Sequence, residues 1–117
     1  MNNQIGSQIE RGEAIKVSGL AKYSKGCIVS RTIYEKDAGS MTVFAFDKGQ
    51  IIKAHSSPYD ATVCLIEGQG KFIVGGKSKI LRKGEMMIMP ANVPHAVEAP
   101  GRFKMLLVMI KGSKTIK

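Results

Sequence analysis

The chain contains no tryptophan, two cysteines, two histidines and half as many acidic as basic residues, nine against 18. It also lacks any run of about eighteen or more apolar residues, the length that a membrane-spanning helix requires, so we expect no membrane association. Residues 1–7 have neither a basic start nor an apolar segment. Because secretory signal peptides have both, the sequence predicts a cytoplasmic protein.

The cysteines offer no sign of reactive or metal-binding chemistry. Cys27 and Cys64 lie in apolar surroundings without Cys-x-x-Cys spacing, which is typical of buried free thiols. Neither has the sequence context of a nucleophile. No Gly-x-Ser-x-Gly or P-loop pattern is present, so the sequence gives no support for a serine hydrolase or a nucleotide-binding protein of the classes that those motifs identify.

The excess of basic residues gives a net charge of +9. Lysines are spread along the chain, with a denser patch over residues 71–83 and an acid-free tail after Glu98. A nucleic-acid-binding protein concentrates such residues on one helix or stripe and interleaves aromatic side chains for stacking, and neither feature is visible. We therefore expect no nucleic-acid partner. A solvated surface is the simplest interpretation, and attraction of an anionic small molecule is the alternative.

The length of 117 residues fits a single domain, 1–117, that buries its own core. Residues 1–26 are weakly patterned and interrupted by glycines, which predicts an arm with a short strand at 14–18. The remainder alternates between β-branched or apolar segments and turn residues, without a convincing helix. We expect strands at 27–35, 41–46, 50–55, 62–66, 71–74, 77–82, 86–89, 96–99 and 103–110.

This spacing of short strands and turns is typical of an all-β sandwich or barrel. Both faces of the strand at 41–46 are largely apolar. We therefore expect one face to pack against a second sheet and the other to be covered by the arm or by a partner. Gly75-Gly76 predicts a tight hairpin between the strands at 71–74 and 77–82.

The two histidines each stand near the end of a glycine-proline frame. The first frame runs from Gly49 through His55 to Gly68, and the second runs from Gly84 through Pro90 to His95. These frames resemble the paired motifs of the cupin superfamily, Gly-x5-His-x-His-x3,4-Glu-x6-Gly and Gly-x5-Pro-x-Gly-x2-His-x3-Asn. The resemblance covers residues 40–111 and extends to small single-domain bacterial cupins. It implies a cupin barrel (double-stranded β-helix, or jelly roll) of two packed antiparallel sheets.

The chain departs from the cupin motifs at the positions that hold a metal. Ser57 replaces the second motif-one histidine, and Ala61 or Thr62 stands in place of the glutamate. Asn92 and Ala99 replace the glycine and the final asparagine of motif two. Only His55 and His95 therefore carry over as metal ligands.

A third ligand would complete the two-histidine, one-carboxylate set of non-haem iron enzymes. Asp60 is the nearest acid, and Ser57 is a weak candidate because its hydroxyl is neutral. The sequence leaves open whether a divalent metal binds, and whether it is zinc, iron, nickel or manganese. Without a metal, His55 or His95 could serve as a general base, with Tyr59 or Asp60 as the acid partner.

Three functions are compatible with these residues. The first is a small-molecule-binding cupin that retains the pocket and a reduced two-histidine metal site. The second is a metal-dependent enzyme, such as a dioxygenase or a sugar isomerase or epimerase. The third is a ligand-sensing accessory module that acts through another protein.

The resemblance also bears on partners. Because the N-terminal arm of many cupins pairs with a second subunit, it implies a homodimer. The net charge favours an anionic ligand such as a carboxylate or a phosphorylated sugar. The methionines on the predicted strands are expected to fill gaps in the core, with lining of an adaptable pocket as the alternative.

Overall fold

The structure is a computed structural model that describes residues 2–4 and 9–111; the remainder of the expected arm, 1 and 5–8, lies outside the described residues. Its strands are β1 (Asn2–Gln4), β2 (Ile28–Lys36), β3 (Gly39–Phe46), β4 (Ile51–His55), β5 (Ala61–Glu67), β6 (Gln69–Val74), β7 (Lys77–Arg82), β8 (Met86–Met89), β9 (His95–Glu98) and β10 (Phe103–Ile110). One 3-10 turn, η1 (Val17–Gly19), stands in the arm.

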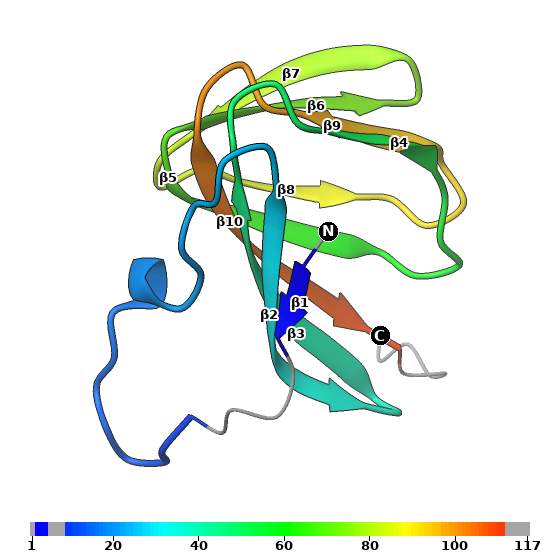
Figure 1. The fold of residues 1–117 in the computed structure, drawn as a ribbon. Helices are drawn as coiled ribbons and strands as arrows, with labels where there is room; N and C mark the ends of the chain where they lie inside the picture. Colours follow the sequence, from blue (N-terminus) through cyan, green and yellow to red (C-terminus); the bar gives the residue numbers. More distant parts are fainter. Residues whose placement is uncertain (1, 5–8, 112–117) are drawn as a thin grey trace.

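The strands form two sheets that face each other (Figure 1). The larger sheet has six strands in the order β1-β2-β3-β10-β5-β8, and the smaller has four in the order β4-β9-β6-β7. Apart from the parallel pair β1 and β2, all described strand pairs are antiparallel. The predicted all-β barrel of two packed antiparallel sheets is confirmed.

Every strand expected after residue 26 is present, with ends that shift by at most two residues. The strand expected at 14–18 is wrong, because the chain there is unpaired and leads into η1. Alternation alone cannot provide a pairing partner, and both edges of β2 are already occupied by β1 and β3. The hairpin at Gly75-Gly76 is confirmed: φ is 56° and 82° at these residues, the pair of positive values that a tight type I′ turn needs.

Alternating side chains of both sheets meet in the hydrophobic core. Phe46, Phe72 and Phe103 are fully buried at one end of it. The rings of Phe46 and Phe103 stack with centroids 4.4 Å apart, and Phe72 meets Phe103 edge-on at 6.2 Å. These aromatic rings fill the core around Phe103, at the start of β10.

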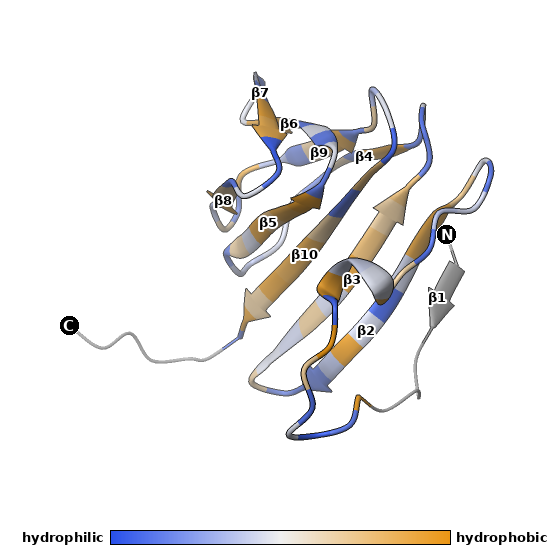
Figure 2. Ribbon diagram, turned by 90° about the vertical axis from the view of Figure 1, so that its left-hand side faces the viewer, coloured by the Kyte–Doolittle hydropathy of each residue, from blue (hydrophilic) through white to orange (hydrophobic). Residues whose placement is uncertain are grey.

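The arm covers the outer face of the larger sheet, with η1 lying over β2 and β3 on the side away from the smaller sheet (Figure 2). Ala21 packs there in a second apolar cluster with Val29, Val43 and Ala45. The expectation that the outer face of 41–46 is covered by the arm is therefore confirmed. This part of the arm packs on the sheet of its own chain.

Candidate ligand pocket between the sheets

A cavity of about 220 Å³ lies between the two sheets, at the end of the barrel away from the stacked phenylalanines. Its lining is mostly apolar, with polar groups only from two histidines and one serine. The lining residues are Phe44, Ile52, His55, Ser57, Ala61, Met89, His95, Val97, Met105, Leu107 and Met109. Because they come from both sheets and from both motif frames, the fold assembles this pocket from distant parts of the chain.

The two histidines stand directly opposite each other on the paired strands β4 and β9. Their ring centroids are 4.5 Å apart, in an edge-to-face arrangement. The register shifts between Ile52 and His55, so that three steps along β4 match two steps along β9. Strict alternation would place Ile52 and His55 on opposite faces, and this bulge is what brings both to the cavity.

Each imidazole is oriented by the backbone carbonyl two residues before it. The Nδ1 atom of His55 lies 3.0 Å from the oxygen of Lys53, and Nδ1 of His95 lies 3.3 Å from the oxygen of Val93. Because a carbonyl oxygen can only accept, each hydrogen bond requires the proton on Nδ1. In a neutral imidazole with this tautomer Nε2 carries a lone pair, and among the described residues neither Nε2 atom has a hydrogen-bond partner.

The two rings differ in burial. His55 is exposed, whereas His95 is 5% exposed. Burial lowers the pKa of His95 from its usual 6.5, and the neighbouring His55 lowers it further, while the hydrogen bond to Val93 acts in the opposite direction. The lowered pKa favours the neutral imidazole of His95 at pH 7, in which Nε2 has a lone pair.

The loops after β4 and β8 are tied together beside the histidines. The backbone N–H of Ala91 donates to Oδ1 of Asp60 over 2.8 Å, and the N–H of Asn92 donates to the carbonyl oxygen of Ser57 over 2.7 Å. The Oγ atom of Ser57 accepts from the backbone N–H of Tyr59 over 3.1 Å. Asp60 thus connects two loops, and neither its side chain nor that of Tyr59 is among those that line the cavity.

The glycines of the two frames have a backbone role. Gly49, Gly68 and Gly84 have φ values of 86°, 74° and 87°, in the left-handed region that side chains disfavour. Asn92, which stands where the second motif has glycine, has a φ of 64° and is the one non-glycine residue with positive φ in the described part. Asparagine tolerates this conformation better than most residues, so the turn is kept despite the substitution.

The side chains present do not fit the usual cupin metal site. Ala61 lines the cavity and Thr62 does not, so the glutamate position that faces the histidines carries a methyl group. Among residues 2–4 and 9–111 no three His, Cys, Asp or Glu side chains lie together as a metal would need. His55 and His95 are brought together, but Asp60 does not join them. Two imidazoles are fewer than the three or four protein ligands of a usual site.

Three methionines contribute to the cavity in a way that spacing did not single out. Met89, Met105 and Met109 line it, from β8 and β10 of the larger sheet. Met89 and Met109 lie on either side of Ala61 in the strand register. Alternation along β10 places Met105 and Met109 on one face, but only the packing of the two sheets shows that this face meets the histidines.

Comparisons with known proteins point to one family. The model of the Cupin domain family matches residues 42–111. A conserved protein of unknown function from Streptococcus pyogenes is 33% identical, with a TM-score of 0.86 over 92% of this chain and 94% of that one. A Cupin 2 conserved barrel domain protein from Leptotrichia buccalis is 42% identical, with a TM-score of 0.78 over 80% of this chain and 46% of that one.

More distant similarity concerns the fold alone. A variant of salicylate 1,2-dioxygenase from Pseudoaminobacter salicylatoxidans has a TM-score of 0.66 and 16% identity over 71% of this chain and 26% of that one. No curated protein matches this sequence. Within the described residues, no helix is long and apolar enough to cross a membrane.

Proposed function

The chain belongs to the cupin domain family, and we propose that its barrel binds a small molecule with an apolar body and a single hydroxyl or carboxyl group. The observation that carries this proposal is the cavity between the sheets. Most of its wall is apolar, and its two imidazoles offer hydrogen-bond acceptors at one place. Such a pocket, with few convergent polar groups, is typical of small-molecule sites.

The size of the cavity limits the ligand. At about 220 Å³ it is smaller than pockets for drug-sized molecules, which measure roughly 300–1,000 Å³. An apolar cavity of about 150 Å³ takes up benzene. A single substituted ring, or an aliphatic compound of similar bulk, therefore matches the space. The methionines Met89, Met105 and Met109 support this function, because flexible thioether side chains adapt to different apolar shapes.

The histidines supply the specificity. When Nδ1 of a neutral imidazole donates to its carbonyl oxygen, its Nε2 atom can accept a hydrogen bond from a ligand O–H. A ligand without such a donor would leave these acceptors unsatisfied in a largely apolar site, which costs binding free energy. This arrangement requires no metal, and the donor set gives no basis for a metal-dependent step.

The charge of the ligand follows from the protonation of His95. A neutral imidazole favours a neutral hydroxyl compound. An anionic carboxylate would instead bind together with a proton, because imidazolium donates to it from Nε2. Binding of an anion should therefore strengthen as the pH falls toward the pKa of His95, whereas binding of a neutral alcohol or phenol should not.

Three probes of similar size test the proposal: phenol, benzoate and benzene. The readout is the NMR signal of the methionine methyl groups, in the full chain labelled at methionine. We expect saturable shifts at Met89, Met105 and Met109 with phenol, and about tenfold weaker binding of benzene, which lacks the donor. Benzoate should bind more tightly at pH 6 than at pH 8.

A His95→Phe variant serves as the matched control, since it retains an aromatic ring in the same strand position. The preference for phenol over benzene should shrink in this variant. Equal affinity of the unmodified chain for phenol and benzene would contradict the role of the histidines. Absence of saturable shifts at the three methionines with all three probes would contradict the proposal that the cavity binds ligands.

A further inference from the structure

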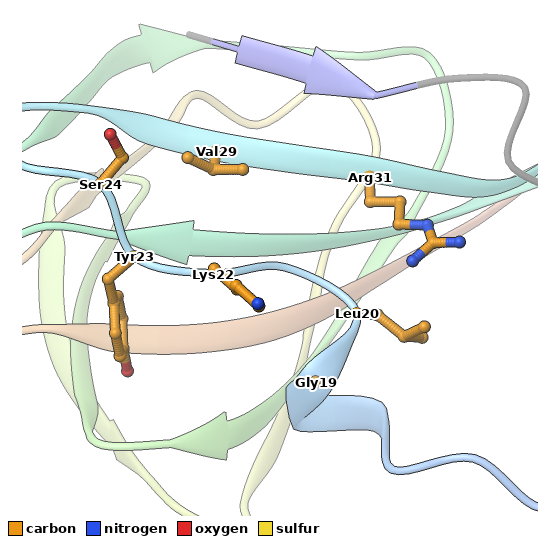
Figure 3. A pocket seen from close by; sticks show the side chains of 7 residues that line it. All are labelled: Gly19, Leu20, Lys22, Tyr23, Ser24, Val29 and Arg31. Carbon is orange, nitrogen blue, oxygen red and sulfur yellow. The ribbon is translucent and has the colours of Figure 1, made fainter.

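A second pocket lies on the opposite side of the larger sheet, between η1, the chain that follows it and β2 (Figure 3). Its volume is about 480 Å³, more than twice that of the cavity between the sheets. Its lining residues are Gly19, Leu20, Lys22, Tyr23, Ser24, Val29 and Arg31. This arm pocket contains no histidine and shares no residue with the cavity between the sheets.

Two basic side chains reach the arm pocket from different segments. Lys22 comes from the arm, whereas Arg31 comes from β2, where it shares a face of the strand with Val29 (Figure 3). Neither forms an ion pair with an acidic side chain of the described residues. The Nε atom of Arg31 is buried and has no hydrogen-bond partner within the described part of the chain.

Other cations on this side of the sheet have partners. Nζ of Lys104 donates to the carbonyl oxygen of Ser18 over 2.6 Å and lies 4.8 Å from the ring centroid of Tyr23. Nε of Arg102 donates to Oδ1 of Asp47 over 2.7 Å. Lys22 and the Nε atom of Arg31 have no such partner among the described residues.

An unpaired buried donor on a cation is unfavourable, and two like charges that line one pocket repel each other. An anion in the pocket offsets this repulsion, although the Nε atom of Arg31 is closed to solvent and would not itself contact such a ligand. The planar guanidinium matches the paired oxygens of a carboxylate or phosphate, and the ammonium adds a second positive charge. Leu20 and Val29 line the pocket beside these charges and could contact an apolar part of the anion.

We infer that the arm pocket is a binding site for a small anion with paired oxygens, a carboxylate or phosphate, held by Arg31 and Lys22. The net charge of +9 raises the concentration of anions near the surface and would assist their entry. This site does not depend on the ligand of the cavity between the sheets. A molecule bound here would also fix the arm against β2, because Lys22 and Arg31 belong to these two segments.

Titration of the full 15N-labelled chain tests the inference, first with inorganic phosphate and then with acetate at constant ionic strength. We expect saturable amide shifts at Gly19, Leu20, Lys22 and Arg31 with at least one of the two, and the stronger of them identifies the anion class. Shifts spread evenly over the lysines of the whole chain, or none at all, would overturn the site.

Substitutions then distinguish binding in the arm pocket from non-specific attraction of anions by the net charge. Lys22→Gln and Arg31→Gln should each weaken binding about tenfold, since each removes a charged hydrogen-bond donor. Lys79→Gln on β7 makes the same change of charge away from the pocket and should leave the affinity unchanged. Because Lys22 is exposed, we expect Lys22→Gln to fold, and it provides the test even if Arg31→Gln does not fold. Equal binding by Lys22→Gln and Lys79→Gln would contradict the inference.

Discussion

Two regions of the molecule differ in how closely they follow the cupin motifs. One is the set of turns in the two motif frames, and the other is the wall of the cavity that faces the histidines. At the turns, the motif glycines Gly49, Gly68 and Gly84 have positive φ, and Asn92 adopts positive φ without being glycine. At the wall, Ser57 and Ala61 stand where the cupin motif has metal ligands. Backbone turns are needed for the sheets to close, whereas ligand side chains are not. A chain can therefore keep the part of the cupin motifs that forms the barrel and lose the part that holds a metal.

The largest effect should come from filling a frame glycine. A Cβ atom at Gly68 would lie 2.3 Å from the carbonyl oxygen of Arg102, and φ is +74° there. Because clash and backbone strain add, we expect Gly68→Ala to lower the free energy of unfolding by about 3 kcal/mol or more in urea denaturation.

Gly76→Ala is the matched control, because φ is +82° and no atom lies within 4 Å of the added Cβ. It should cost only the strain of the left-handed conformation, about 1–2 kcal/mol. If the two variants were equally stable, the close approach to Arg102 would have no role in closing the barrel.

Removal of the loop connection at Asp60 should have the next largest effect. Asp60→Ala deletes the acceptor for the N–H of Ala91, and we expect a loss of about 1–2 kcal/mol in the same urea experiment. Asp60→Asn keeps an acceptor oxygen and should lose less. If Asp60→Ala left stability unchanged but reduced the metal content, Asp60 would be a metal ligand. The claim that the metal site is lost while the turns are kept would then fail.

Asn92 offers a smaller test of the turn positions. Asn92→Gly should be neutral to within about 0.5 kcal/mol, and Asn92→Ala should destabilise by about 1 kcal/mol, because alanine disfavours positive φ. Thermal unfolding of the two variants side by side provides the comparison. A glycine variant less stable than the alanine variant would show that the asparagine side chain, and not the backbone, is what the turn requires.

The smallest expected effect concerns the pKa of His95 in the wall of the cavity. Burial and His55 lower it, so His55→Ala should raise it, which NMR titration of the imidazole signals measures. Between the folded pKa and the usual 6.5 the unfolded chain binds more protons, so stability should rise with pH across that window. A pKa of His95 at or above 6.5 would contradict the neutral imidazole on which the proposed ligand chemistry rests.

Much of the fold could be predicted from the sequence because turn residues and alternation are local signals. Gly75-Gly76 fixed a hairpin, and every strand from 27 onward was recognisable. The segment at 14–18 misled because alternation there has no pairing partner. The strand β1 depends on the edge of β2, about 25 residues away, and no local pattern encodes such a pairing.

The site was predictable in part. Spacing predicted that His55 and His95 belong to one site, and the structure places the two residues opposite each other on β4 and β9. It could not decide between Ala61 and Thr62, nor reveal the bulge that turns His55 inward, because both depend on register. Nor could it show that the carboxylate of Asp60 is used by the N–H of Ala91.

The most direct test of the separation between barrel and metal site is the zinc content of the untagged protein after incubation with zinc and removal of the unbound ion. The unmodified chain should retain far less than one zinc ion per chain, and Ser57→His/Ala61→Glu, which restores the missing ligands, should retain about one. Retention of about one zinc per unmodified chain, lost in His55→Ala/His95→Ala, would show that two histidines suffice and would contradict the account.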